Sequence, residues 1–474
     1  MLPELFCERM KDMLGEEYAA FLDSYEQDRY QALRINPLKK SADGARITPE
    51  QLPFSLKKVP WAEDGYYYGK EEQPGKHPYH QAGLYYIQEP SAMAPVTLLG
   101  VQPGERILDL CAAPGGKSTQ IAAALQGQGL LICNEIHPAR AKILSENVER
   151  MGVVNACVTN ETPERLAEVF SEYFDRILVD APCSGEGMFR KNEDACGEWS
   201  PENVRLCAER QDHILKCAAR MLRPGGRLVY STCTFAPLEN EGSISRFVAA
   251  HPEFHILPAE PVKSILRQQA LRLGNGIAEW TEAPAPHLED ALHLWPQFVA
   301  GEGHFAAVLE KDGNLPEGYM AVPSVGLERS ASEKELGDYT TFVREELSPE
   351  LQKRLLGNGC CIKFGDHIYW VTEGMPAVKG LKVLRPGLHM GTLKKNRFEP
   401  AHALALALAP GETKHMWDLS SQDDSAKAYL CGQTFSAEGE KGWYLICVDG
   451  FSMGWGKLAG SVMKNHYPKG LRCL

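Results

Sequence analysis

The sequence predicts an α/β fold built on a parallel β-sheet with helices on both of its faces. Two observations lead to this prediction. Strand-like and helix-like segments alternate through residues 105–309, and a glycine-rich turn follows the first strand-like run. Repeated strand–helix units bring successive strands side by side in parallel, with helices above and below the sheet.

The elements of this region are predicted from apolar runs and from signals that start and stop helices. The predicted strands are residues 105–111, 130–135, 156–160, 175–180 and 226–232. The predicted helices are residues 118–125, 138–151 and 201–222. Pro138 suits the first turn of the second helix, and Gly152 ends it. Ligands collect at the carboxyl ends of the strands in such sheets, and four side chains lie at these ends: Cys111, Glu135, Asp180 and Cys233.

The length of 474 residues favours roughly three domains. The first hundred residues read as a separate α/β lobe, and after about residue 311 the pattern becomes helix-rich and then turns to short strands. We predict a lobe over 1–95, a central domain over 96–312, and a two-part C-terminal region divided into 313–385 and 386–474.

The composition excludes several classes of protein. The chain is 44% hydrophobic and 24% charged, as in globular proteins, and it does not begin with a basic segment followed by an apolar block. Its longest apolar stretch, residues 401–410, is too short to cross a bilayer. The fourteen cysteines show no spacing typical of zinc ligands, so we predict no metal site and expect reduced thiols in the cytoplasm.

The charge pattern favours a nucleic-acid partner despite a net charge of −12. Residues 376–398 and 451–474 contain lysines and arginines but no acid, and the second segment also holds Trp455 and Tyr467. Basic side chains neutralise phosphates, and aromatic rings stack on unpaired bases. The alternative is a pair of solvated basic surfaces, but two such segments in an acidic chain favour RNA or DNA.

The loop over residues 111–117 is predicted to hold a nucleoside cofactor. Its Gly-Lys-Ser resembles a phosphate loop, but the earlier glycine of that motif would fall at Cys111. A nicotinamide dehydrogenase would carry Gly-x-Gly-x-x-Gly, whereas this loop reads Ala-Pro-Gly-Gly. Glu135 lies twenty residues beyond Gly115 at the end of the next strand, where an acid binds ribose hydroxyls.

Two further predicted strands end near a cysteine. Asp180-Ala-Pro-Cys183 follows one strand, and Ser231-Thr232-Cys233 ends the next. Asp180 could cap a helix and Cys183 could be a buried apolar residue. Two cysteines beside a nucleoside site instead favour thiolate chemistry, which requires surroundings that lower the thiol pKa.

These motifs together resemble the NOP/Sun family of RNA cytosine-5 methyltransferases. The matching blocks are residues 111–117, 180–185 and 231–240, and residues 294–311 resemble the strand pair that closes the family's catalytic domain. The C-terminal region resembles that of the RsmF-type bacterial ribosomal RNA enzymes, and residues 449–458 and 464–472 resemble the end of their PUA-like RNA-binding domain.

The resemblance implies a Rossmann-like class I methyltransferase domain, an N-terminal RNA-binding-like lobe and a PUA-like, β-rich C-terminal domain. It implies that Cys233 attacks cytosine C6, that Cys183 assists product release, and that Asp180 lies between the cofactor and the base. S-adenosyl-L-methionine is the implied cofactor, held by Cys111, Ala112, Ala113, Pro114, Gly115, Gly116, Lys117, Glu135, Arg140 and Asp180.

One segment departs from the family pattern. Where the family usually has an adenine-contacting aspartate, this chain has Thr162, with Asn160 and Glu161 as possible substitutes. We expect a monomer acting on ribosomal RNA or a ribosomal subunit assembly intermediate. One alternative is a tRNA cytosine-5 methyltransferase, which phosphate contacts do not distinguish from a ribosomal RNA enzyme. The other is a non-catalytic RNA-binding assembly factor, which the presence of both cysteines and the acids disfavours.

Overall fold

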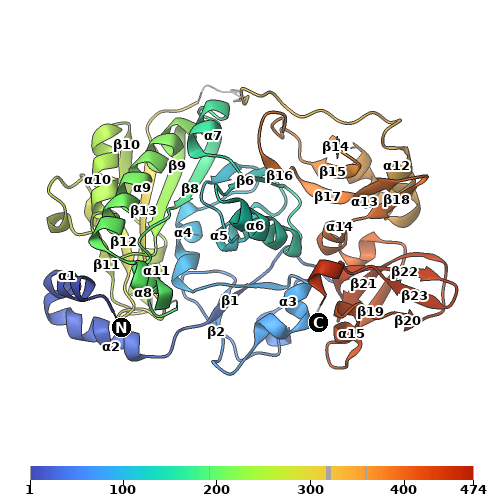
Figure 1. The fold of residues 1–474 in the computed structure, drawn as a ribbon, viewed down its shortest axis with the longest axis horizontal. Coiled ribbons are helices and arrows are strands. Elements are labelled where there is room, and N and C mark those ends of the chain that lie inside the picture. Colours follow the sequence, from blue (N-terminus) through green and yellow to red (C-terminus); the bar gives the residue numbers. More distant parts are fainter. Residues whose placement is uncertain (1, 192, 316–321, 358–359, 473–474) are drawn as a thin grey trace.

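The computed structural model describes residues 2–191, 193–315, 322–357 and 360–472 (Figure 1). The remaining residues of the predicted domains (1, 192, 316–321, 358–359 and 473–474) lie outside this description. Within the described ranges, no helix combines the length and apolarity that a membrane span requires.

A ten-stranded sheet forms the centre of the molecule. Nine of its strands lie side by side in the order β11-β12-β13-β9-β8-β5-β6-β7-β16, and β10 also pairs with β13. Their bounds are β5 Arg106–Asp109, β6 Leu130–Asn134, β7 Ala156–Thr159, β8 Phe174–Asp180, β9 Leu222–Thr232, β10 Phe254–Leu257, β11 Gly274–Asn275, β12 Leu292–Leu294, β13 His304–Lys311 and β16 Val383–Arg385.

The five strands predicted from apolar runs are the five parallel strands of this sheet. Neighbours among β7, β6, β5, β8 and β9 all pair in parallel, as expected for strand–helix units. The sheet as a whole is mixed, however, because β13 pairs antiparallel with β9 and β16 pairs antiparallel with β7. The expectation of a parallel sheet was therefore right for the centre and wrong for both edges.

Helices cover both faces of the sheet. One face carries α4 Ala94–Leu99, α5 Gly116–Leu125, α6 Pro138–Arg150 and α11 Val262–Gln268, and the other carries α7 Pro163–Val169, α9 Pro201–Met221 and α10 Glu241–Ala250. Helix α9 begins where Ser200 accepts a hydrogen bond from the backbone N–H of Asn203 (3.0 Å). Helix α5 begins two residues earlier than predicted, because Gly115 turns the chain with a φ of +115°.

The N-terminal region divides between two places in the molecule. Helices α1 Glu4–Leu14 and α2 Tyr18–Glu26 lie against the central domain, where Phe6 and Phe21 pack with Trp199 and Phe235 (Figure 1). The strands form a separate antiparallel sheet in the order β2-β3-β1-β4. Their bounds, with those of the short helix beside them, are β1 Ala32–Ile35, β2 Lys57–Lys58, β3 Gly65–Tyr67, β4 Tyr85–Ile87 and α3 Pro78–Gln81.

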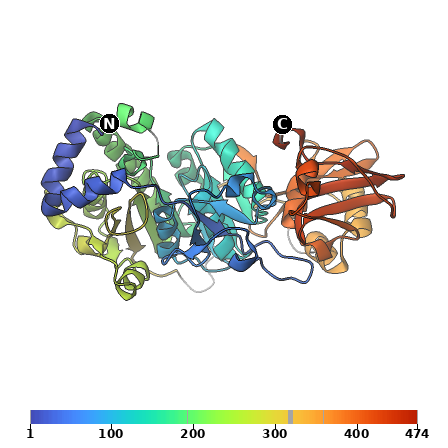
Figure 2. The ribbon, with the colours of Figure 1, turned by 90° about the horizontal axis from the view of Figure 1, so that it is seen from below.

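The C-terminal region holds two β-sheets at one end of an elongated molecule (Figure 2). The first has the order β14-β15-β17-β18 and the second β19-β21-β22-β23-β20, and apolar side chains of both share one core. The predicted boundary between residues 385 and 386 falls inside the first sheet, because two of its strands precede the boundary and two follow it. The elements are α12 Gly337–Glu346, α13 Pro349–Gly357, β14 Cys360–Phe364, β15 His367–Val371, β17 Leu388–Lys394, β18 Arg397–Pro400, α14 His402–Ala407, β19 Met416–Leu419, α15 Ser425–Leu430, β20 Phe435–Ser436, β21 Gly442–Val448, β22 Phe451–Ala459 and β23 Val462–Asn465.

Candidate functional site

A pocket of about 220 Å³ opens at the carboxyl ends of the parallel strands. It lies where β5 has β6 on one side and β8 on the other, so that the strand order reverses at this point. Open α/β sheets bind ligands at such a switch point. The walls include residues 111–114, 116 and 117, Asp180, Cys233 and residues 302–304, with Tyr86 and Gln88 from the N-terminal sheet.

Two arginines hold the glycine-rich loop from different sides. Arg34 of the N-terminal sheet donates to the Gly116 carbonyl (2.9 Å), and Arg140 of α6 donates to the Ala113 carbonyl (2.9 Å). A Cβ on Gly116 would lie 3.2 Å from the Gln88 side-chain nitrogen, which leaves little room for a larger residue. Arg140 was expected at the cofactor site, whereas Arg34 and Gln88 were not identified from the sequence.

A charged pair crosses the floor of the pocket. Lys117 Nζ lies 2.7 Å from Asp180 Oδ2, Ser231 donates to Asp180 Oδ1 (2.8 Å), and His304 Nε2 lies 3.5 Å from the same oxygen. Burial opposes the charge of Asp180, but Lys117 and His304 outweigh it and hold the pKa of this carboxyl well below its usual value. Asp180 is therefore ionised and acts as a hydrogen-bond acceptor at neutral pH.

The two cysteines of the strand-end motifs meet beside this pair. Cys183 Sγ and Cys233 Sγ are 3.4 Å apart, and Cys233 lines the pocket. The contact with Cys233, together with burial, raises the pKa of the Cys183 thiol well above its usual value. The lysine shares the pocket wall with Cys233, and the cysteine contributes to raising the pKa of Lys117 although burial opposes this. The site thus places a cation near one sulfur of a thiol pair.

Glu135 follows β6 and is buried, but it lies outside the set of residues that line the pocket. Its carboxylate accepts the backbone N–H of His137 (2.8 Å) and lies 3.4 Å from the Arg140 guanidinium. Glu135 and Arg140 are therefore neighbours outside the pocket wall, and their assignment to the cofactor stays a prediction.

The segment that departs from the family pattern already has protein partners. Thr162 caps α7 by accepting the N–H of Arg165 (3.3 Å), and the Asn160 amide donates to the carbonyl of Glu135 (2.7 Å). The Glu161 carboxylate accepts the backbone N–H of Lys382 (2.6 Å), next to β16. A strand from the C-terminal region thus covers this side of the sheet.

Sequence reasoning missed His304 and the residues around it. His304 begins β13, which is far from the cysteine motifs in the chain and is brought next to Asp180 by pairing with β9. Its neighbour Glu302 forms a buried ion pair with Arg190 (2.7 Å). The Gly-Glu-Gly-His run at 301–304 was the available signal, but it was interpreted only as part of a closing strand pair.

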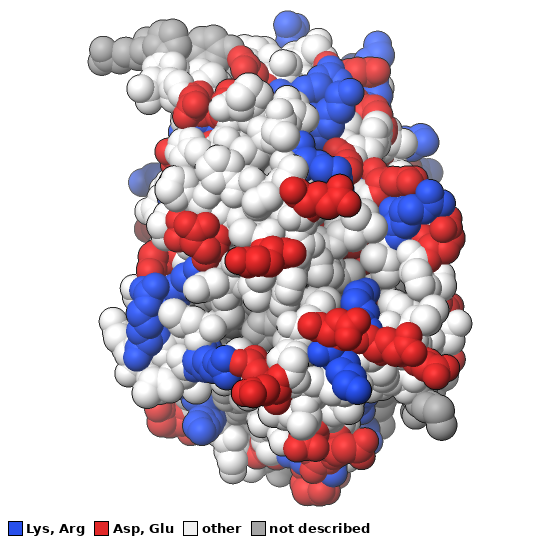
Figure 3. All heavy atoms as spheres, turned by 90° about the vertical axis from the view of Figure 1, so that its left-hand side faces the viewer, with Lys and Arg blue, Asp and Glu red and all other residues white. Residues whose placement is uncertain are grey.

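The aromatic part of the predicted RNA surface is wrong. Trp455 and Tyr467 are both only 2% exposed, so neither ring can stack on a base. Arg385 is also buried, where it pairs with Glu149. The lysines Lys379, Lys382, Lys394, Lys395 and Lys464 are exposed. On the face at the end of the molecule opposite the C-terminal region, basic and acidic side chains are interspersed (Figure 3).

The pocket suits a nucleoside cofactor. It combines the turn at 113–116 with apolar walls, and one carboxyl oxygen of buried Asp109, Oδ1, has no hydrogen-bond partner among the described residues. Burial raises the pKa of Asp109 to about 7. A buried oxygen without a partner is costly, and a ligand with hydroxyl or amino groups would satisfy it.

Family models match successive parts of the chain. The 16S rRNA methyltransferase RsmB/F model matches residues 96–310, and the N-terminal domain of 16S rRNA methyltransferase RsmF matches 2–90. The RsmF rRNA methyltransferase first C-terminal domain matches 341–408, and the methyltransferase RsmF PUA domain matches 418–473.

Relatives extend over almost the whole chain. Ribosomal RNA small subunit methyltransferase F of Shewanella baltica is 32% identical over 95% of this chain and 92% of its own, and that of Vibrio vulnificus is 32% identical over 99% and 97%. A solved methyltransferase homologue from Pyrococcus horikoshii is 28% identical over 65% of this chain and 95% of its own, with a TM-score of 0.55.

A second solved structure, NSun6 from Pyrococcus horikoshii with SFG, is 19% identical and has a TM-score of 0.52 over 66% of this chain and 99% of its own, which supports the fold alone. The predicted class, a Rossmann-like methyltransferase domain with a C-terminal PUA domain, is confirmed. S-adenosyl-L-methionine is the cofactor of these enzymes and of this chain. With relatives matched from end to end, the chain belongs to the RsmF group of the RsmB/F family of 16S rRNA methyltransferases.

Proposed function

We propose that this methyltransferase modifies C5 of cytosine in ribosomal RNA, by covalent attack of Cys233 on C6 of the base. The observation that carries the proposal is the pair of sulfurs 3.4 Å apart at the pocket that contains Lys117 and Asp180. A methyltransferase acting on nitrogen or oxygen needs no thiol, whereas C5 of cytosine becomes nucleophilic only after addition at C6.

The reaction uses the two thiols in turn. The Cys233 thiolate forms a bond to C6, and the electron pair of the C5–C6 double bond moves to C5. S-adenosyl-L-methionine supplies the methyl group that C5 takes up. A base then removes the C5 proton, the double bond re-forms and the C6–sulfur bond breaks. Cys183 lies within reach of the departing sulfur and assists this last step.

The other site residues hold the reactants. The loop residues Cys111, Ala112, Ala113, Pro114, Gly116 and Lys117 line the pocket and would hold the cofactor, together with Gly115 in the turn and with Glu135 and Arg140 beside the loop. Asp180 has its charge fixed by Lys117, and it lies between this loop and Cys233, where it can accept a hydrogen bond from the cytosine amino group.

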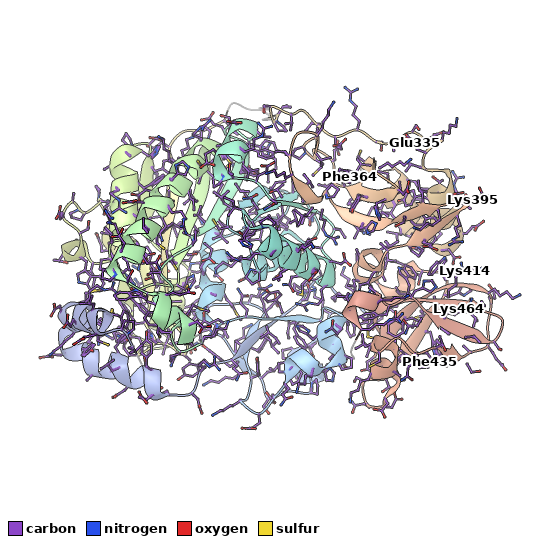
Figure 4. All side chains as sticks on the ribbon, viewed as in Figure 1. Glu335, Phe364, Lys395, Lys414, Phe435 and Lys464 are labelled. Carbon is purple, nitrogen blue, oxygen red and sulfur yellow. The ribbon has the colours of Figure 1, made fainter. Side chains whose placement is uncertain are left out.

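The substrate is RNA whose target base is unstacked. C6 of a base inside a duplex is inaccessible, so a loop or a partly assembled ribosomal subunit suits the site better than a closed helix. We propose that the enzyme acts as a monomer in the cytoplasm, where such subunits assemble. The exposed lysines of the C-terminal region, among them Lys395 and Lys464, would contact the phosphates (Figure 4).

Replacing each cysteine in turn tests the mechanism. In Cys233→Ala we expect neither methyl transfer nor a covalent RNA adduct, because the nucleophile is absent. In Cys183→Ala we expect attack and transfer to proceed while elimination slows, so protein cross-linked to methylated RNA should accumulate. Denaturing gels run with reductant measure the adduct, because a thioether survives reduction, and bisulfite sequencing identifies the base.

Cys157→Ala is the matched control, because Cys157 is a buried cysteine on β7 outside the pocket. It should leave turnover and adduct unchanged. Adducts that persist in Cys233→Ala and vanish in Cys183→Ala would reverse the two roles. Full turnover in both variants would reject thiol chemistry altogether.

A further inference from the structure

The residues that follow the two cysteines are bonded to each other and to one buried acid. Ser184 Oγ lies 2.8 Å from Thr234 Oγ1, so the chain just after Cys183 contacts the chain just after Cys233. Glu239 accepts both the backbone N–H of Ser184 (3.0 Å) and its hydroxyl. One carboxylate therefore ties together the loops that carry the two sulfurs.

Glu239 is completely buried and firmly held. Gln211 of α9 donates to Glu239 Oε2 (2.8 Å), the oxygen that also accepts the Ser184 N–H, and to the Pro182 carbonyl (3.0 Å). Tyr230 donates to the backbone carbonyl of Glu239 (2.6 Å). This acid belongs to neither the cofactor loop nor the pocket wall. Its hydrogen bonds converge on the segment 182–184 instead, which indicates that its role concerns Cys183.

The charges around the two sulfurs are unequal. Lys117 shares the pocket with Cys233, whereas Glu239 is bonded to the residue next to Cys183. Two sulfurs 3.4 Å apart cannot both carry a negative charge at low cost, so at most one of them is a thiolate and the other keeps its proton. A cation beside one sulfur and an anion behind the other favour the charge on Cys233 and the proton on Cys183.

We propose that Glu239 is a positioning residue that holds the Cys183 loop against Cys233 and, through its negative charge, keeps the proton of the thiol pair on Cys183. Cys233 is then the thiolate that attacks, and Cys183 is the thiol that serves the elimination step. The consequence for turnover rests on the proposed cytosine-C5 reaction, but the distribution of charge between the sulfurs does not.

Alkylation tests the distribution of charge without RNA. The titratable groups that face Glu239 are Cys183, Glu186, Cys207 and Tyr230, and burial raises the pKa of Glu239 to about 7. At pH 8 the carboxylate is therefore mostly ionised. Limited iodoacetamide treatment followed by peptide mass spectrometry should show Cys233 reacting faster than Cys183 in the unaltered enzyme.

Glu239→Gln removes the charge but can keep most hydrogen bonds, because its amide can accept from Ser184 N–H and donate to Ser184 Oγ. We expect the ratio of Cys183 to Cys233 alkylation to rise roughly threefold to tenfold. Lowering the pKa of the Cys183 thiol by one unit raises its thiolate population tenfold, and the lower nucleophilicity of that thiolate offsets part of the gain. Turnover should fall through kcat, with KM for RNA unchanged. Glu239→Asp retains the charge and should keep the preference for Cys233.

Glu241→Gln is the matched control. Glu241 is also fully buried and lies two residues away, but it bonds His293 (2.7 Å) and not the cysteine loops. An alkylation ratio unchanged in Glu239→Gln, shifted equally in Glu241→Gln, or shifted in Glu239→Asp would overturn the proposal. If the unaltered enzyme showed no cytosine methylation while the ratio shifted as expected, the proposed function would fail and the role of Glu239 would stand.

Discussion

At the scale of single residues, the site depends on buried charges that stabilise one another. Asp180 is only partly buried, and it stays ionised because Lys117 and His304 lie beside it. Asp109 is buried only two residues before the cofactor loop and has Ser118 as a donor (2.6 Å), and its pKa is raised to about 7. Lys117 lowers the pKa of both aspartates, but it is paired directly with Asp180, whereas burial outweighs its effect on Asp109.

Glu135→Ala should weaken binding of S-adenosyl-L-methionine by roughly 1.5–3 kcal/mol, because a charged acceptor for two ribose hydroxyls is lost. Isothermal titration calorimetry measures this directly. Glu146→Ala, an exposed acid on α6, serves as the control and should bind normally. Unchanged affinity in Glu135→Ala would remove that residue from the cofactor site.

At the scale of elements, the hairpin of β17 and β18 carries two exposed lysines at its turn. Lys394 ends β17, Lys395 follows in the turn, and both are exposed (Figure 4). The hairpin belongs to the sheet that crosses the predicted division at residue 386, so deletion of 386–474 would remove two strands from that sheet. Point substitutions in the turn are therefore a better test of RNA binding than deletion.

The double variant Lys394→Ser/Lys395→Ser should weaken RNA binding and reduce its dependence on salt. If both lysines contact phosphates of single-stranded RNA, the slope of log K against log salt should fall by roughly 1.4. Fluorescence anisotropy at several salt concentrations measures the slope. Lys216→Ser, on the exposed side of α9, should leave it unchanged. An identical slope in the double variant would show that RNA binds elsewhere.

At the scale of the whole molecule, buried polar contacts join the two ends of the chain. Lys39 is 3% exposed, and its ammonium donates to the Leu406 carbonyl (2.7 Å) and to both the carbonyl (3.1 Å) and hydroxyl (2.8 Å) of Ser452. Tyr79 donates to Asp449 (2.8 Å) in the same interface. Burial lowers the pKa of Lys39 to about 7.

This lysine predicts that stability rises with pH. Between pH 7 and the ordinary lysine value of 10.5, the unfolded chain binds a proton that the folded chain does not, so unfolding becomes harder as pH rises. Relative to Lys39→Met, the unaltered protein should gain on the order of 2 kcal/mol between pH 7 and pH 9. Urea unfolding at both pH values measures the gain. As a control, Lys40→Met changes an exposed neighbour and should show the same pH dependence of stability as the unaltered protein. If Lys39→Met also showed that pH dependence, Lys39 would not be its cause.

The sequence alone determined the central elements and the edge of the sheet where the site lies. Apolar runs such as residues 175–180 identify buried strands. The last residue of each parallel strand then lies at the carboxyl edge of the sheet. The loop at 111–117, Asp180 and both cysteines were therefore predictable, because each is adjacent in the chain to the element that positions it.

Only the tertiary structure decided which distant residues complete the site. His304 reaches Asp180 through the pairing of β13 with β9, and β16 closes the sheet edge at Glu161. Glu239, in the segment after β9, contacts Ser184, in the segment after the adjacent strand β8. Trp455 and Tyr467 look like surface aromatics in the sequence, but they are buried in cores shared between sheets. Such contacts join residues far apart in the chain, and local periodicity carries no information about which of them will meet.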